Sequence, residues 1–241
     1  MRTFVLGAML LALTSLACDT NVAPLKSNVQ VSFATRGPGT APAPARAPAV
    51  WQAVLNDTLT DSTNAIVITR ALMVLSQIEL SQAQGAGCAT LECEIAVGPV
   101  LVDLPLVHGA QLEFAVTVPV GTYSEVDFEV HKVTMQDPPA LRDVMLNRSI
   151  HVEGTFNGEP FTFESELDAE QELVMSPPVA IADTSATNIT IRVALDAWFQ
   201  SANGGGLLDP RDVANRSTIE EAIKVSLQAF KDDDHDGQID P

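Results

Sequence analysis

The residues best suited to chemistry lie near the C-terminal end of the chain, in the run KDDDHDGQIDP. Acidic side chains occupy alternate positions there, and Gly237 stands directly after the third of them. This spacing matches the first nine positions of an EF-hand calcium loop, which needs oxygen ligands at alternate positions and a glycine at the sixth for its sharp turn. We therefore predict a Ca²⁺ site, in which Gln238 ligates through its backbone carbonyl and the other ligands through side chains. The predicted ligands are Asp232, Asp234, Asp236, Gln238 and Asp240.

The affinity expected of this loop is low. The sequence stops at Pro241, before the twelfth position, where an EF-hand loop places a bidentate glutamate. We therefore expect a dissociation constant of about 10⁻⁴–10⁻³ M, as in extracellular calcium modules. The alternative interpretation is a frayed, solvated acidic tail without a bound ion.

The three cysteines indicate an exported protein. Cys18 follows an apolar run and small residues, a pattern that resembles the lipobox at which bacterial lipoproteins are cleaved and lipidated. Cys88 and Cys93 then form an even pair in an oxidising compartment, and we predict a structural disulfide between them. A catalytic redox pair is the disfavoured alternative, because such pairs are more often separated by two residues than by four.

The N-terminal segment also indicates export from the cytoplasm. Residues 1–17 are predicted to be a signal peptide, because Arg2 precedes an apolar run that is too short to cross ~30 Å of hydrocarbon. Residues 18–27 would form the spacer behind the lipid anchor. We expect the mature chain in the cell envelope, lipid-anchored to a membrane and facing the periplasm or the cell exterior. Cleavage without lipidation, giving a freely secreted protein, is the alternative.

The charge of the chain limits its partners. Its 13 basic and 31 acidic residues give a net charge of −18. Such a chain repels nucleic acid and anionic lipid headgroups, so we expect no nucleic-acid partner. The expected partner is a membrane, which the chain contacts through its lipid anchor. A protein or glycan partner is also possible, and the sequence does not identify it.

Acidic side chains also alternate along three strand-like segments, residues 125–131, 151–153 and 164–172. If these strands were neighbours, His131, His151 and nearby glutamates could hold a metal ion. The favoured interpretation is simpler, since such alternation is typical of the wet face of a half-buried sheet.

Evidence for an enzyme is weak. The sequence has no G-x-S-x-G nucleophile motif and no phosphate-binding loop. One tyrosine and two tryptophans are few for a sugar-binding cleft. A hydrolase of envelope or environmental polysaccharide, acting through surface carboxylates, is the alternative to a non-enzymatic protein.

The elements that must position these residues are mainly strands. Short segments of alternating hydrophobicity recur between Ala65 and Ala197, and Asn157–Glu159 is typical of a hairpin turn. We predict an antiparallel β-sandwich, of the immunoglobulin or transthyretin kind, over residues 28–200. This domain would include a Pro/Ala-rich loop at 37–49, where proline prevents helix and ladder pairing.

One helix is expected, at the end of the chain. Apolar residues recur at helical spacing over Ser217–Phe230, and Ser217 with Glu220 matches a capping box. We predict that residues 201–231 form a connector and a packed C-terminal helix, which leads into the acidic calcium-type loop at 232–241.

Several motifs resemble a family of uncharacterised bacterial lipoproteins of the domain-of-unknown-function kind. The resemblance covers roughly Val29 to Asp240 and implies a sandwich fold and an envelope address, without an enzyme activity. Together with the motifs above, it favours a non-enzymatic, membrane-anchored binding or scaffold module with a calcium-type loop. The strings that carry it are VGPVLVDLPL, VPVGTY, FEVHKV, SIHVEGTFNGEPFTFES, NITIRVALDAWF, GGGLLDP and IEEAIKVSLQAFKDDDHDG.

Overall fold

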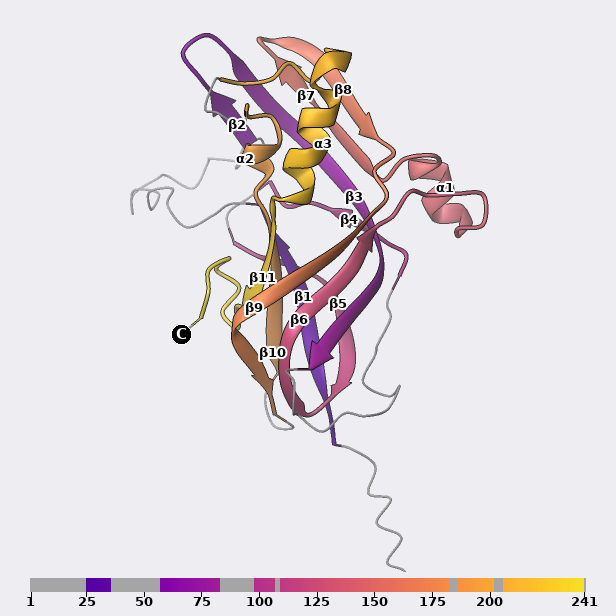
Figure 1. Ribbon diagram of the computed structural model, residues 1–241, viewed down its shortest axis with the longest axis vertical. Helices are drawn as coiled ribbons and strands as arrows, with labels where there is room; N and C mark the ends of the chain where they lie inside the picture. Colours follow the sequence, from indigo (N-terminus) through magenta and orange to yellow (C-terminus); the bar gives the residue numbers. More distant parts are fainter. Residues whose placement is uncertain are drawn as a thin grey trace, which may run out of the picture.

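Two β-sheets packed in sandwich fashion form most of the molecule, so the predicted mainly β, antiparallel fold is confirmed (Figure 1). The computed structural model describes residues 25–35, 57–82, 98–106, 109–182, 186–201 and 206–240. The signal peptide, Cys18, the loop at 37–49 and the predicted disulfide partners Cys88 and Cys93 lie outside the described residues. Among the described residues, no helix has the length and apolar character needed to cross a membrane.

The smaller sheet has four strands. β1 and β5 are antiparallel, as are β10 and β11, whereas β1 and β10 run parallel. The sheet extends past residue 200, because β11 forms one of its edges. Its order is β11 (Leu227–Lys231), β10 (Thr187–Val193), β1 (Lys26–Ala34) and β5 (Gln111–Pro119).

The larger sheet is built around the 18-residue strand β3 (Ala65–Gln82), to which four other strands pair directly. All of its pairs are antiparallel. Along the main path the order is β8 (Glu159–Ser165), β7 (Ile150–Phe156), β3, β6 (Gly121–Val130) and β9 (Ala169–Ile181). The short strands β2 (Asp57–Thr60) and β4 (Val100–Asp103) also pair with β3.

Local sequence explains the turn between β7 and β8. Asn157 and Gly158 have φ values of 53° and 83°, which is the left-handed backbone that a two-residue hairpin requires. Asn157 also accepts a hydrogen bond from the backbone N–H of Ala65 at 2.8 Å, which joins the turn to β3. The predicted hairpin is confirmed.

A continuous apolar core joins the two sheets. Buried residues alternate with exposed ones at the start of β1, whereas the middle of β3 and nearly all of β10 are buried on both faces. Trp198 and Phe199 are fully buried beside them. The Trp198 indole donates to Ser226 Oγ at 2.8 Å, and Phe161 and Phe163 contact the Phe199 ring edge-on. These aromatic contacts hold the segment after β10 against the larger sheet.

The helices are short: α1 (Pro139–Met145), α2 (Leu195–Trp198), the 3₁₀ turn η2 (Val213–Asn215) and α3 (Arg216–Lys224). The helix predicted for Ser217–Phe230 is therefore confirmed in part, and its second half is wrong. Ser226 Oγ donates to the carbonyl of Ile223, and Leu227–Phe230 then pair with β10 as part of β11. The apolar spacing of this stretch fits both a helix and a strand. It forms a strand because it can pair with the edge of β10.

The capping box is also wrong. Ser217 lies inside α3, and the N-cap residue Asn215 makes no side-chain capping bond. The Glu220 carboxylate accepts from Ser165 Oγ at 2.6 Å instead, and so joins α3 to β8.

Candidate metal sites

The loop that holds the predicted calcium ligands follows β11 directly. The expectation of a helix leading into this loop is wrong, because the strand continues up to it. The backbone N–H of Asp232 donates to the carbonyl of Asn188 at 3.0 Å, so pairing with β10 extends into the first loop residue. The loop is thereby fixed to the edge of the smaller sheet.

Asp232 is the anchor of the loop and is completely buried. Its Oδ1 accepts from the backbone N–H of Asp236 at 3.0 Å. Its Oδ2 accepts from Gly237 N–H at 3.0 Å and from Thr190 Oγ1 at 2.8 Å. The loop is therefore folded around this carboxylate and is hydrogen-bonded to β10 beneath it.

Gly237 takes the turn position that the motif predicts. Its φ of +80° lies in the left-handed region, which glycine adopts without a steric penalty. A side chain there would also contact the Cβ of Ala34, at 3.4 Å. The turn therefore packs against the end of β1.

Three of the five predicted ligands converge. Asp232, Asp234 and Asp236 each offer a carboxylate oxygen, and these three oxygens lie within 4.8 Å of one another. Burial raises the pKa of Asp232, and the nearby Asp234 adds to this, although hydrogen bonds from Thr190, Gly237 and Asp236 oppose it. Three carboxylates this close repel one another unless a cation lies between them.

The other two predicted ligands are arranged differently. The Asp240 carboxylate accepts from the backbone N–H of Asp233 at 2.6 Å and lies 3.5 Å from Lys231 Nζ. Gln238 donates to Asp236 through its backbone N–H, at 2.7 Å, and through its side-chain amide, at 3.0 Å. Asp240 and Gln238 are therefore not in the converging group, and Asp240 Oδ2 is engaged by Asp233 and Lys231.

A buried polar network lies beneath the loop, and sequence reasoning missed it. Asn188 Nδ2 donates to the carbonyl of Asp232 at 2.7 Å and to Thr190 Oγ1 at 3.0 Å, while Asn188 Oδ1 accepts from Ser32 Oγ at 2.7 Å. His235 Nδ1 lies 3.3 Å from the same Ser32 hydroxyl. The signal in the sequence was the pair of polar residues, Asn188 and Thr190, that alternate with Ile189 and Ile191 in β10.

The two histidines considered as metal ligands have separate carboxylate partners. His151 Nε2 lies 2.9 Å from Glu153, and its Nδ1 lies 3.3 Å from Glu164. His131 Nε2 lies 3.1 Å from Asp137, and its Nδ1 lies 3.6 Å from Glu129. These contacts give each histidine a carboxylate set of its own.

His131 also belongs to a group of three residues that could hold a metal ion. Glu129, His131 and Asp168 each offer a ligand atom, and the three atoms lie within 4.8 Å of one another. Burial acts to raise the pKa of the neighbouring Asp137, but hydrogen bonds from Thr134 and His131 outweigh it, and the pKa is lowered. Asp137 is therefore a charged acceptor for the imidazole.

An acidic cavity of about 400 Å³ adjoins this group. It lies on the outer face of the larger sheet, where β6 pairs with β9 and Asp127 stands opposite Glu172. Its lining is rich in carboxylates and shares Glu129 with the metal-type group. The lining residues are Gln77, Glu79, Asp127, Phe128, Glu129, Glu170, Gln171 and Glu172.

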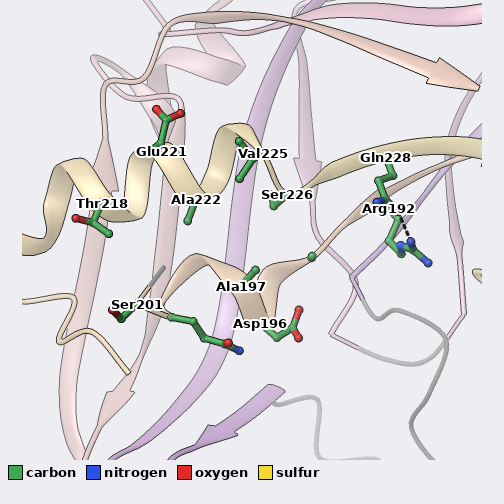
Figure 2. A pocket seen from close by; sticks show the side chains of 12 residues that line it. Arg192, Asp196, Ala197, Ser201, Thr218, Glu221, Ala222, Val225, Ser226 and Gln228 are labelled. Carbon is green, nitrogen blue, oxygen red and sulfur yellow. Dashed lines mark hydrogen bonds between the residues drawn. The ribbon is translucent and has the colours of Figure 1, made fainter. Parts of the chain in front are cut away.

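A larger cavity, of about 540 Å³, lies between α2 and α3 (Figure 2). Small and apolar side chains such as Ala197, Ala222 and Val225 line its middle. Arg192 and Gln228 lie together at one end, joined by a hydrogen bond (Figure 2). The Arg192 guanidinium also lies 5.3 Å from the centre of the Phe230 ring. The cavity therefore combines an apolar surface with one cation that is already paired.

Comparison with known proteins gives no match: no protein-family model, no curated protein and no solved structure matches this chain. The resemblance to a lipoprotein family therefore stays a prediction from the sequence motifs alone.

Proposed function

We propose that this chain is a non-enzymatic, lipid-anchored module of the bacterial cell envelope, which binds a protein or glycan partner and whose C-terminal loop binds Ca²⁺. The observation that carries the calcium part is the convergence of Asp232, Asp234 and Asp236 on a loop that is hydrogen-bonded to the sheet. The signal-peptide pattern of residues 1–17 and the position of Cys18 support the anchor.

Calcium would act on stability through the sheet edge. A divalent cation neutralises the repulsion between the three carboxylates, and Ca²⁺ prefers six to eight oxygen ligands. The aspartates supply three of these, and the Gln238 carbonyl and water would supply others. Since Asp232 is bound to β10 through Thr190, an ion at this point would fix the end of β11 to the body of the smaller sheet.

The size of this effect follows from linkage. An ion that binds only the folded chain stabilises it by RT ln(1 + [Ca²⁺]/Kd). With a dissociation constant of about 10⁻⁴–10⁻³ M, 10 mM calcium gives about 1.4–2.7 kcal/mol. Calcium would therefore modulate the stability of the module at millimolar concentrations.

Isothermal titration of the purified protein with Ca²⁺ and with Mg²⁺ tests this proposal. We expect heat of binding with calcium, loss of that heat in Asp234→Ala, and no change in Asp143→Ala. Asp143 is a matched control, because it is an exposed aspartate on α1. Equal titration curves for wild type and Asp234→Ala would refute calcium binding by the loop.

A second candidate function uses the acidic cavity on the larger sheet. A polysaccharide hydrolase needs two carboxylates that face the scissile bond, and this cavity supplies five. The one aromatic residue in its lining, Phe128, is 3 % exposed and offers little surface for stacking a sugar ring. Release of reducing ends from purified peptidoglycan or glycans, lost in Glu129→Gln, would favour the hydrolase over the binding module.

A further inference from the structure

We infer that Glu129, His131 and Asp168 form a second metal site, built for a divalent transition metal such as Zn²⁺ rather than for Ca²⁺. The site is separate from the C-terminal loop and shares no ligand with it. Its ligand atoms lie within 4.8 Å of one another, and an imidazole nitrogen is among them.

The strand register explains how these residues meet. Glu129 lies near the end of β6, and His131 follows the strand two positions later, on the same face. β6 pairs with β9 in antiparallel register, with Val130 opposite Ala169. One further step along both chains places His131 opposite Asp168, which directly precedes β9. Two strands that are distant in sequence thus bring the three ligands together.

Asp137 determines which nitrogen of His131 faces the other ligands. Its Oδ1 lies 3.1 Å from His131 Nε2, and its Oδ2 accepts from the backbone N–H and the hydroxyl of Thr134 at 2.7 and 2.9 Å. When a neutral His131 donates from Nε2 to Asp137, its lone pair is on Nδ1, the nitrogen on the Glu129 side. Metal-binding histidines are oriented in this way, by donating their second N–H to a carboxylate.

The distance between Nδ1 and Glu129 fits two ligands of one ion. It is 3.6 Å, too long for a good hydrogen bond. Two ligands at about 2.05 Å from a tetrahedral Zn²⁺ are roughly 3.4 Å apart. A metal ion between Nδ1 and Glu129 would attract both groups. Glu129 is itself held in place by Ser76, whose hydroxyl donates to its Oε2 at 2.6 Å.

The ligand set selects the metal. Imidazole nitrogen suits zinc and other first-row transition metals, whereas calcium and magnesium prefer oxygen alone. Three protein ligands would leave a fourth position for water. Asp168 is the exposed member of the group. Glu129 also lines the acidic cavity, so an ion here would lie at the end of that cavity.

Zinc affinity is measured on the purified full-length protein by competition with a chromophoric chelator. We expect one zinc ion to bind, with at least tenfold loss of affinity in His131→Gln and in Asp168→Asn. Asp137→Asn removes no ligand, and we expect an affinity loss of about 10- to 100-fold from misorientation of the imidazole. His151→Gln is the matched control, because that histidine also contacts two carboxylates. It should leave zinc affinity unchanged.

Two further measurements separate this site from the calcium loop. Asp234→Ala should keep the zinc affinity, whereas His131→Gln should keep any calcium affinity. Bound Co²⁺ should give the visible absorption of a nitrogen- and oxygen-ligated ion in wild type and lose it in Asp168→Asn, which changes only an exposed side chain. Equal zinc affinity in wild type, His131→Gln and Asp168→Asn would overturn the proposal, and so would loss of zinc in Asp234→Ala.

Discussion

Replacing Asp232 with asparagine is the sharpest perturbation of the C-terminal loop, because the two side chains have the same shape. Asp232 uses both carboxylate oxygens as acceptors, with three donors around them. Asparagine has one oxygen and one NH₂ group. At least one of the backbone donors, on Asp236 or Gly237, must then face another donor.

The expected loss of unfolding free energy has two parts: the unpaired backbone donor and the lost calcium binding. A buried donor left without an acceptor costs about 1–3 kcal/mol. Removing a charge that is completely buried and close to Asp234 offsets part of that cost. We therefore expect a loss of about 1 kcal/mol in the presence of a chelator. In 10 mM calcium the variant also loses the stabilisation of about 1.4–2.7 kcal/mol that the ion gives to wild type.

Urea unfolding with calcium, with magnesium and with chelator measures both the cost of the unpaired donor and the stabilisation by calcium. We expect calcium to raise the unfolding free energy of wild type and to leave Asp232→Asn almost unchanged. In thermal melting, 1 kcal/mol corresponds to about 2–4 °C for a chain of this size, so the calcium shift of wild type should be on the order of 5 °C. Asp143 is an exposed aspartate on α1, so the control variant Asp143→Asn should unfold like wild type under all three conditions.

Two results would refute the reasoning in different ways. If wild type and Asp232→Asn gain equally from calcium, the ion does not bind at this loop. If they unfold at the same urea concentration in chelator, the hydrogen bonds around Asp232 do not stabilise the fold.

Three other predictions concern the anchor, the cysteine pair and acid stability. Cys18→Ser should abolish lipid labelling and detergent partitioning, and a variant that still partitions like wild type would contradict the lipoprotein hypothesis. Air-oxidised protein should show no free thiol at Cys88 or Cys93, so quantitative alkylation of both residues would exclude the disulfide. Backbone N–H groups, first that of Leu207, lower the pKa of Asp61, so its stabilising effect is present above the unfolded value of 3.8 and is lost as the pH falls through the folded pKa. Asp61→Asn should therefore be less stable than wild type at pH 7, and the difference between their urea midpoints should shrink below about pH 4.

Local pattern predicted those parts of the fold that local physics decides. The alternation of apolar residues predicted the strands, since alternate residues of a strand lie on the same face. The hairpin at Asn157 was predictable, because Asn-Gly adopts the left-handed backbone at little cost. The aspartate spacing likewise predicted that Asp232 and Gly237 would take the positions of a calcium-type turn.

The helix at the end of the chain shows where local pattern fails. Ile219 and Ile223 repeat at helical spacing, and Leu227 continues that repeat, but Leu227 and Ala229 also fit the period of a strand. Local propensity does not separate these alternatives. The open edge of β10 does, because pairing with it satisfies the backbone of Leu227–Lys231.

The second metal site could not be predicted from the sequence, for a related reason. The sequence shows His131 among acidic residues, but it does not show that β9 lies beside β6. Only that pairing brings Asp168 to His131, and only the bend after β6 brings Asp137 to its other nitrogen. A wet acidic face and a metal site therefore have the same local signature.

The residues beneath the C-terminal loop decide between a tail and a structural element. Asn188 and Thr190 are buried in β10, where apolar side chains would cost less to bury. Both are hydrogen-bonded to Asp232, so removing the loop would leave them without these partners. The first residue of the loop is therefore attached to the sheet, and the interpretation as a solvated tail is wrong for Asp232. Since protein donors already hold that carboxylate, calcium should stabilise a chain that is folded without it. This is why unfolding in chelator is a meaningful baseline for the Asp232→Asn comparison.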